Sequence, residues 1–224
     1  MQLFLHFLET RAPQAEYLYI LGDLFDAWLG DDDQQDPIPD IKQALRRLSE
    51  SGVRLKLMHG NRDFLIGQDF CLETGAELLE DPSLIDLFGI PTLLMHGDLL
   101  CTDDQAYQQF RREIRAPEFV RQFLSLPMEQ RITLAREYRA KSGEANSLKP
   151  EAIMDVNQQT VTEYLTRHRA GRIIHGHTHR PADHPFSLDG DPVSRHVLGE
   201  WHGEGAEFIC ATQDGLLRER IDAG

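Results

Sequence analysis

Four times along this chain, a short apolar run leads directly into a cluster of Asp, Asn or His. The clusters are GDLFD after residues 16–21, GNRD after 53–58, HGD after 91–95 and GHTH after 171–174. The runs are rich in Leu, Ile and Tyr, which is typical of buried strands. Because helical spacing over residues 40–50 separates the first two runs, the pattern predicts a layered α/β fold. In such folds the loops at the carboxyl ends of the strands carry function.

The four clusters supply one set of candidate metal ligands, which are Asp23, Asn61, His96, His177 and His179. Carboxylate, amide oxygen and imidazole together suit Mn²⁺, Fe²⁺ or Zn²⁺ better than Ca²⁺. A mixed set drawn from separate strands is typical of a two-metal hydrolase, in which one carboxylate bridges the ions. Each cluster alone has a simpler interpretation as a turn or a cap. Their ordered co-occurrence favours the metal site.

Charge and cysteine content narrow the class of protein. The formal net charge of the 224 residues is -14, which argues against a nucleic-acid-binding protein. The cysteines Cys71, Cys101 and Cys210 are far apart, so we expect three reduced thiols, as in the cytosol, and no thiolate zinc site. The N-terminal residues do not have the pattern of a signal peptide. No apolar run approaches the roughly 18 residues of a membrane-spanning helix.

Residues 107–149 differ from the rest of the chain. They have helical periodicity, with an apolar stripe at Phe119, Phe123 and Leu124. They carry 9 Lys/Arg and 5 Asp/Glu, which leaves a net charge of -18 on the remainder. One interpretation is a helical cap with a solvated charged face. The other is a lid over an anionic, partly apolar ligand, or a contact with a membrane surface.

Longer strings around the same clusters resemble a known family. The similarity is to the calcineurin-like metallophosphoesterases, and it lies in five strings: LGDLFDAWLGDDD, HGNRDFLIG, MHGDLLCTDDQAYQQFR, SGEANSLKPEAIMDVNQ and IHGHTHRP. Within that superfamily they resemble the bacterial UDP-2,3-diacylglucosamine pyrophosphatases of lipid A biosynthesis, with Arg62 where the general pattern has His. The resemblance covers essentially the whole chain. It implies one α/β domain over residues 1–224, a β-sandwich flanked by helices, with a helical lid insertion at about 104–150.

The resemblance also implies a reaction. The family hydrolyses the pyrophosphate of UDP-2,3-diacylglucosamine to UMP and 2,3-diacylglucosamine 1-phosphate (lipid X), with a Mn²⁺ pair activating the water that attacks the α-phosphorus. By motif, Asp23 bridges the metals, Asn61, His96 and His177 complete the second metal, and His179 belongs to the first. Asp23, Asn61, His96 and His177 are the residues implied in catalysis. Those implied in substrate binding are Asn61, Arg62, Asp104, Tyr107, Ser142, Asn146, Lys149 and His177.

The same resemblance gives the basic lid a role and the protein a location. Its apolar stripe is expected to shelter the two acyl chains, and its basic face to meet phosphates or the membrane surface. We expect a monomer that contacts the cytoplasmic face of the inner membrane peripherally and binds no nucleic acid.

One family motif does not occur in this chain. The family begins with a strand that ends in Asp-x-His and supplies two ligands of the first metal, and no such motif precedes Asp23. His6 lies in a stretch with helical spacing. We therefore expect the first strand to be missing and at most one metal to be well held. An upstream in-frame segment is the favoured explanation, because the other motifs are intact.

Two alternatives to the implied activity follow. The first is a truncated, inactive form that binds the lipid and one metal without cleavage. The second is a metallophosphoesterase acting on another nucleotide substrate.

Overall fold

Two sheets form the centre of the protein. The computed structural model describes residues 1–147, 151–203 and 205–222, and for 142–147 and 151–152 it describes the backbone only. The first sheet is parallel, in the order β1 (Tyr17–Ile20), β2 (Arg54–Met58), β3 (Glu77–Leu79). In the described chain β1 pairs with β2 alone.

The second sheet has five strands in the order β4-β5-β6-β8-β7. Its strands are β4 (Ser83–Leu87), β5 (Ile90–Met95), β6 (Arg172–His175), β7 (Ala182–Leu188) and β8 (Asp191–Val197). The inner strands β5, β6 and β8 are parallel, and the edge strands β4 and β7 are antiparallel to their neighbours. A separate hairpin, β9 (Gly205–Thr212) and β10 (Gly215–Asp222), follows near the C-terminus.

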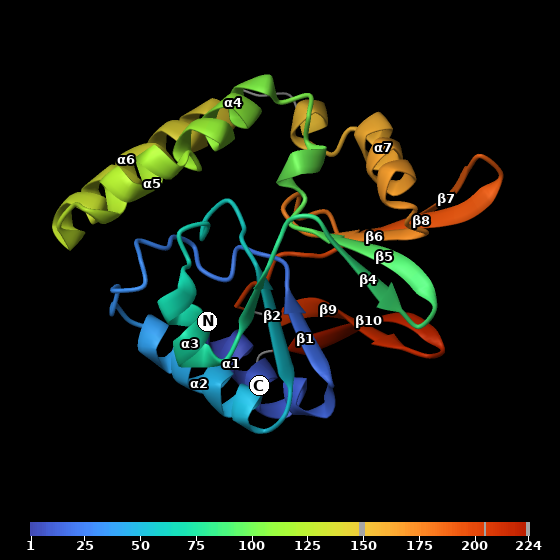
Figure 1. Cartoon of the computed structure of the whole chain (residues 1–224), viewed down its shortest axis with the longest axis horizontal. Coiled ribbons are helices and arrows are strands. Elements are labelled where there is room, and N and C mark those ends of the chain that lie inside the picture. The colour runs from blue at the N-terminus through green and yellow to red at the C-terminus, as the bar shows by residue number, and fades with distance from the viewer. Residues whose placement is uncertain (148–150, 204, 223–224) are drawn as a thin grey trace.

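The two main sheets pack against each other as a sandwich. Leu21, Met58, Leu94 and Ile174 form a buried cluster, so each of the four apolar runs contributes one residue to it. Because β1, β2, β5 and β6 all run into polar clusters, this packing brings the four clusters to one edge (Figure 1). The expected β-sandwich flanked by helices is confirmed.

Helices cover both outer faces of the sandwich. On the first sheet lie α1 (Gln2–Thr10), α2 (Ile38–Glu50) and α3 (Gln68–Thr74), and on the second lies α7 (Gln158–His168). In α2 the buried residues Ile41, Leu45 and Leu48 recur at helical spacing and face the main core. In α7, Val161 and Leu165 pack on Leu93 and Ile173 of the second sheet. Short 3-10 helices lie at Ala12–Gln14, Asp98–Leu100 and Glu151–Met154.

The basic segment forms three helices that lie across the upper edge of the molecule in Figure 1. They are α4 (Gln105–Ile114), α5 (Pro117–Leu124) and α6 (Met128–Ser147), and we call them the lid helices. The predicted helical periodicity is thus confirmed. Phe123 is buried in the main core, and Phe119 and Leu124 pack against that core. The predicted apolar stripe therefore attaches α5 to the body of the protein. This corrects the expectation that the stripe shelters acyl chains, because Phe123 is buried in the core.

Two smaller findings concern the cysteines and the helices. The three cysteines are free thiols. Among the described residues, no helix combines the length and the apolar character that crossing a bilayer requires.

Candidate metal centre

The predicted ligands converge at the edge where β1, β2, β5 and β6 end. Asp23, His96 and His177 each offer one ligand atom, and these atoms all lie within 4.8 Å of one another. The side-chain oxygen of Asn61 lies among them, 3.0 Å from His96 Nε2 and 2.8 Å from His177 Nδ1. The structure thus brings together four of the five predicted ligands from four different strand ends.

The backbone of these loops is held in an uncommon conformation. Asp23, His177 and His179 have φ angles of 54°, 66° and 54°. Non-glycine residues rarely adopt this left-handed region, and such residues cluster at functional sites. Gly60 makes the close approach possible, because a Cβ there would collide with the carboxylate and the backbone nitrogen of Asp23. The loops after β1 and β2 therefore touch only because glycine occupies this position.

His96 and His177 each turn one ring nitrogen toward the site. His96 Nδ1 lies 2.8 Å from the carbonyl oxygen of Leu21, so its N–H donates there and leaves Nε2 facing the site. Burial, together with the nearby His96, lowers the pKa of His177 to about 4. Metal binding requires a neutral imidazole, and His177 is neutral at pH 7. One carboxylate, one amide oxygen and two imidazoles fit a divalent first-row metal such as Mn²⁺, Fe²⁺ or Zn²⁺.

Asp63 is a site residue that sequence reasoning missed. Its fully buried carboxylate accepts backbone N–H bonds from Gly60 (2.8 Å), Asp23 (3.2 Å) and Leu24 (2.7 Å). Burial and the nearby Asp23 carboxylate raise the pKa of Asp63 to about 6. The residue ties the loop that carries Asp23 to the loop that carries Asn61. Its place as the last residue of GNRD was the available signal.

Arg62 and His179 lie at the open side of the site, near a second missed residue, Glu200. Arg62 Nε is 3.7 Å from Asp23 Oδ2, and its Nη1 is 3.0 Å from Asp26 Oδ1. His179 Nδ1 lies 3.1 Å from Glu200 Oε2. Glu200 follows β8, which is parallel to β5 and β6, so its strand ends at the same edge. Only the strand order places Glu200 at the site, and local sequence does not reveal strand order.

Of the predicted substrate-binding residues in the lid segment, the structure describes the side chains of Asp104 and Tyr107. Asp104 caps α4 by accepting the backbone N–H of Tyr107 at 3.0 Å. Tyr107 donates its hydroxyl to Asp98 Oδ2 at 2.9 Å, and its ring centroid is 5.6 Å from that of His177. The side chains of Ser142 and Asn146, and all of Lys149, lie outside the described residues.

Asp98 is a third missed residue, at the end of HGD. Burial alone would raise the pKa of its carboxyl, but His96 and Arg111 hold that pKa well below its usual range. Arg111 Nε donates to Asp98 Oδ2 at 2.7 Å. Asp98 is therefore a buried carboxylate that stays ionised beside the candidate ligands.

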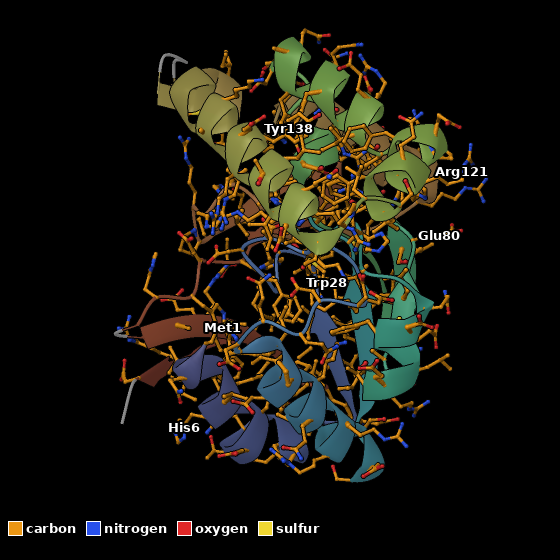
Figure 2. All side chains as sticks on the ribbon, turned by 90° about the vertical axis from the view of Figure 1, so that its left-hand side faces the viewer. Met1, His6, Trp28, Glu80, Arg121 and Tyr138 are labelled. Carbon is orange, nitrogen blue, oxygen red and sulfur yellow. The ribbon has the colours of Figure 1, made fainter. Side chains whose placement is uncertain are left out.

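Two other histidines are explained without a metal. His175 is fully buried and lies between Arg195 Nη1, 3.2 Å from its Nε2, and the Gly176 carbonyl oxygen, 2.9 Å from its Nδ1. Burial lowers the pKa of His175 to about 3, so it is a neutral support for the loop that carries His177. His6 lies in α1, as expected, and Figure 2 shows it at the end of the molecule opposite Tyr138 of the lid helices.

Comparisons with known proteins agree on one family. A sequence profile of the calcineurin-like phosphoesterases matches residues 2–181. The UDP-2,3-diacylglucosamine hydrolase of Chromohalobacter salexigens is 51% identical over 91% of this chain and 83% of its own length. The hydrolases of the same name from Stutzerimonas stutzeri and Salmonella typhi are 50% and 51% identical, over 90% and 95% of this chain and 84% and 88% of theirs.

Proposed function

Because this chain belongs to the calcineurin-like phosphoesterase family, and within it groups with the UDP-2,3-diacylglucosamine hydrolases, we propose that it hydrolyses UDP-2,3-diacylglucosamine. The bond cleaved is the pyrophosphate, and the products are UMP and 2,3-diacylglucosamine 1-phosphate. The observation that carries the proposal is the convergence of Asp23, Asn61, His96 and His177, with Tyr107 of α4 packed beside His177. Three relatives of the same name favour this substrate over another nucleotide.

The metal would be held by Asp23, Asn61, His96 and His177. This donor set suits Mn²⁺, Fe²⁺ and Zn²⁺, and we propose Mn²⁺ among them because the family resemblance implies it. When bound, such an ion supplies Lewis-acid chemistry, by activating water and by neutralising charge on phosphoryl oxygens. The protein's own part is to fix the ligands: Asp63 holds two loops, and the Leu21 carbonyl orients His96. His179 would bind the first metal, on the side of the site where Glu200 lies.

Arg62 is proposed to bind the substrate phosphates. Its guanidinium lies beside Asp23 and is about one third exposed, so its donors are accessible from the open side of the site. A planar guanidinium presents paired donors that match phosphate oxygens. Tyr107 and Asp104 lie at the start of the lid helices, where the sugar would enter. Ser142, Asn146 and Lys149 keep their predicted role in substrate binding.

The lid helices and the lipid substrate support a location as well. A two-chain lipid stays in a bilayer, so the enzyme would act while bound peripherally to the cytoplasmic face of the inner membrane, as a monomer. The excess of basic residues over 107–149 would favour contact with anionic headgroups. The helical insertion would then serve as a lid over the acyl chains.

The experiment is an assay of UMP release from UDP-2,3-diacylglucosamine by the purified protein. We expect release with Mn²⁺ and none after chelation. An Asn61→Ala variant should bind Mn²⁺ more weakly and lose release, while His6→Asn should match the wild type. Absence of UMP with Mn²⁺, Fe²⁺ and Zn²⁺ alike would refute the proposal. Equal turnover of acylated and deacylated substrate would instead favour the alternative of another nucleotide substrate.

A further inference from the structure

The first lid helix, α4, is held to the body in an unusual way. None of its residues, Gln105–Ile114, is fully buried, so no apolar core fixes it. Beside it lies a cavity of about 420 Å³ whose lining includes His59, Asp81, Arg111 and Arg115. By contrast α5 inserts Phe123 into the main core. The position of α4 therefore depends mainly on polar contacts.

Those polar contacts meet at Asp98, whose side chain is fully buried. Its Oδ2 accepts the Tyr107 hydroxyl at 2.9 Å and Arg111 Nε at 2.7 Å, and lies 3.7 Å from Arg115 Nη2. The backbone carbonyl of Asp98 also accepts Gln108 Nε2 at 2.8 Å. A buried carboxylate is tolerated only with such partners, and its hydrogen bonds to cationic groups are strong. Asp98 thus contacts side chains from successive turns of α4.

The same helix reaches all three loops that carry the second-metal ligands. Asp98 lies two residues after His96. Arg115, directly after α4, donates Nη2 to the Gly60 carbonyl at 2.8 Å, next to Asn61. The Tyr107 ring packs near the ring of His177. The ends of β2, β5 and β6 are therefore braced by one helix.

We propose that Asp98 is a positioning residue that couples the seating of α4 to the arrangement of Asn61, His96 and His177. When Asp98 holds α4, the helix holds the three loops at the spacing that a metal needs. By linkage, a metal bound to those loops must in turn stabilise the seated helix. The inference rests on the metal site of the proposed function, and it does not depend on which substrate is cleaved.

The test uses Mn²⁺ alone as the probe, on the full chain. Calorimetry measures Mn²⁺ affinity, and hydrogen exchange with mass spectrometry follows the amides of α4. In the wild type, Mn²⁺ should slow exchange in α4. In Asp98→Asn, we expect roughly tenfold weaker Mn²⁺ binding, the usual scale for losing a residue that orients metal ligands. We also expect the slowing in α4 by Mn²⁺ to disappear. A purely structural role would leave that metal-dependent slowing in place.

The matched control is Asp32→Asn, which also removes a carboxylate that ties a lid helix to the body. Asp32 pairs with Arg131 of α6 at 2.6 Å, and it lies outside the three loops that carry Asn61, His96 and His177, although it shares the connection between β1 and α2 with Asp23. This variant should exchange faster near the start of α6 and keep both the Mn²⁺ affinity and the slowing in α4. If Asp98→Asn behaves as Asp32→Asn does, the proposal is wrong.

Asp98→Asn could unfold the protein, so a milder variant is included. Tyr107→Phe removes one hydrogen bond from Asp98 and keeps the ring beside His177. It should lower the Mn²⁺ affinity and the slowing of exchange in α4 by Mn²⁺, each by a smaller factor than Asp98→Asn does. If neither quantity changes, the proposal is wrong. Failure of the wild type to release UMP would refute the substrate assignment, while Mn²⁺ affinity and exchange would still decide the role of Asp98.

Discussion

At the scale of single residues, the site depends on three uncommon backbone conformations and on one close contact that only glycine allows. Asp23, His177 and His179 have left-handed backbone conformations, and Gly60 lies directly against Asp23. These conformations cost free energy that the surrounding contacts offset, chiefly the four backbone N–H bonds accepted by Asp63. Local sequence indicates the ligand types, but it does not reveal this strain, because the strain arises only when two loops meet.

Gly60→Ala tests that close approach. The added Cβ would push the Asp23 carboxylate away, so we expect a loss of about 2–3 kcal/mol in the free energy of unfolding, the scale of overpacking a well-packed site. Mn²⁺ affinity should fall as well. Denaturant unfolding and calorimetry measure the two effects. The control is Gly203→Ala, where a Cβ meets nothing within 4 Å, and equal behaviour of the two variants would contradict the argument.

Asp183 allows a prediction about pH that is independent of the metal centre. Hydrogen bonds from Arg218, with the help of His196, lower the pKa of Asp183. A lowered folded pKa means that this stability is present above the ordinary aspartate value of about 3.9 and is lost as the pH falls through the folded value. Asp183→Asn should therefore flatten the decline of the melting temperature below about pH 4, modestly, because the side chain is half exposed.

The comparison variant for that measurement is Asp214→Asn. Asp214 is exposed in the β9–β10 turn, and among the described residues it makes no ion pair. Its acid profile should follow the wild type, and a flattened profile in this variant would remove Asp183 as the cause.

At the scale of elements, the strands and the lid helices differ in how they are held. The four strands that end at the site, β1, β2, β5 and β6, are fixed by backbone ladders and by buried apolar residues, so their presence was predictable. The other six strands of the described chain were not predicted. The lid helices are fixed by a few long-range contacts, at Asp98, Phe123 and Arg131. Periodicity predicted that these segments are helical, but not where they would attach.

Arg131→Met tests the attachment of α6. The buried guanidinium donates to the carbonyls of Leu29 (3.0 Å), Leu124 (2.7 Å) and Leu126 (2.8 Å), so its loss leaves these acceptors without their donor. We expect a loss of about 2–3 kcal/mol in the free energy of unfolding and faster proteolysis within 115–131. Arg121→Ala is the control, because Arg121 is exposed on α5 and pairs only with Glu118 among the described residues. Equal stability of the two variants would refute the role given to Arg131.

At the scale of the whole molecule, two sheets that each carry half of the ligands must stay packed for the site to exist. Asp23 and Asn61 follow strands of the first sheet, and His96 and His177 follow strands of the second. A metal at their meeting point would therefore link the two halves of the sandwich. Binding to the folded state alone raises stability by mass action.

That link predicts a metal-dependent melting temperature. Mn²⁺ at one hundred times its dissociation constant should stabilise the fold by about 2.7 kcal/mol. For a chain of this size this corresponds to roughly 5–10 °C, reversed by chelation. His96→Asn should abolish most of the shift. His6→Asn should retain it, since His6 is exposed in α1, at the end of the molecule opposite Tyr138 of the lid helices. An equal shift in both variants would place the Mn²⁺ somewhere else.

The sequence by itself determined the four strands that lead into the site and the chemistry of the site. Apolar runs ending in Asp, Asn or His indicated buried strands and the ligands after them, because burial and turn chemistry are local properties. Only the tertiary structure decided which residues meet. Residues as far apart as Asp23 and His177 converge because Leu21, Met58, Leu94 and Ile174 pack the sheets together. Asp98, Glu200 and Arg131 acquired their roles in the same way, since no local pattern specifies a contact across two sheets and a lid.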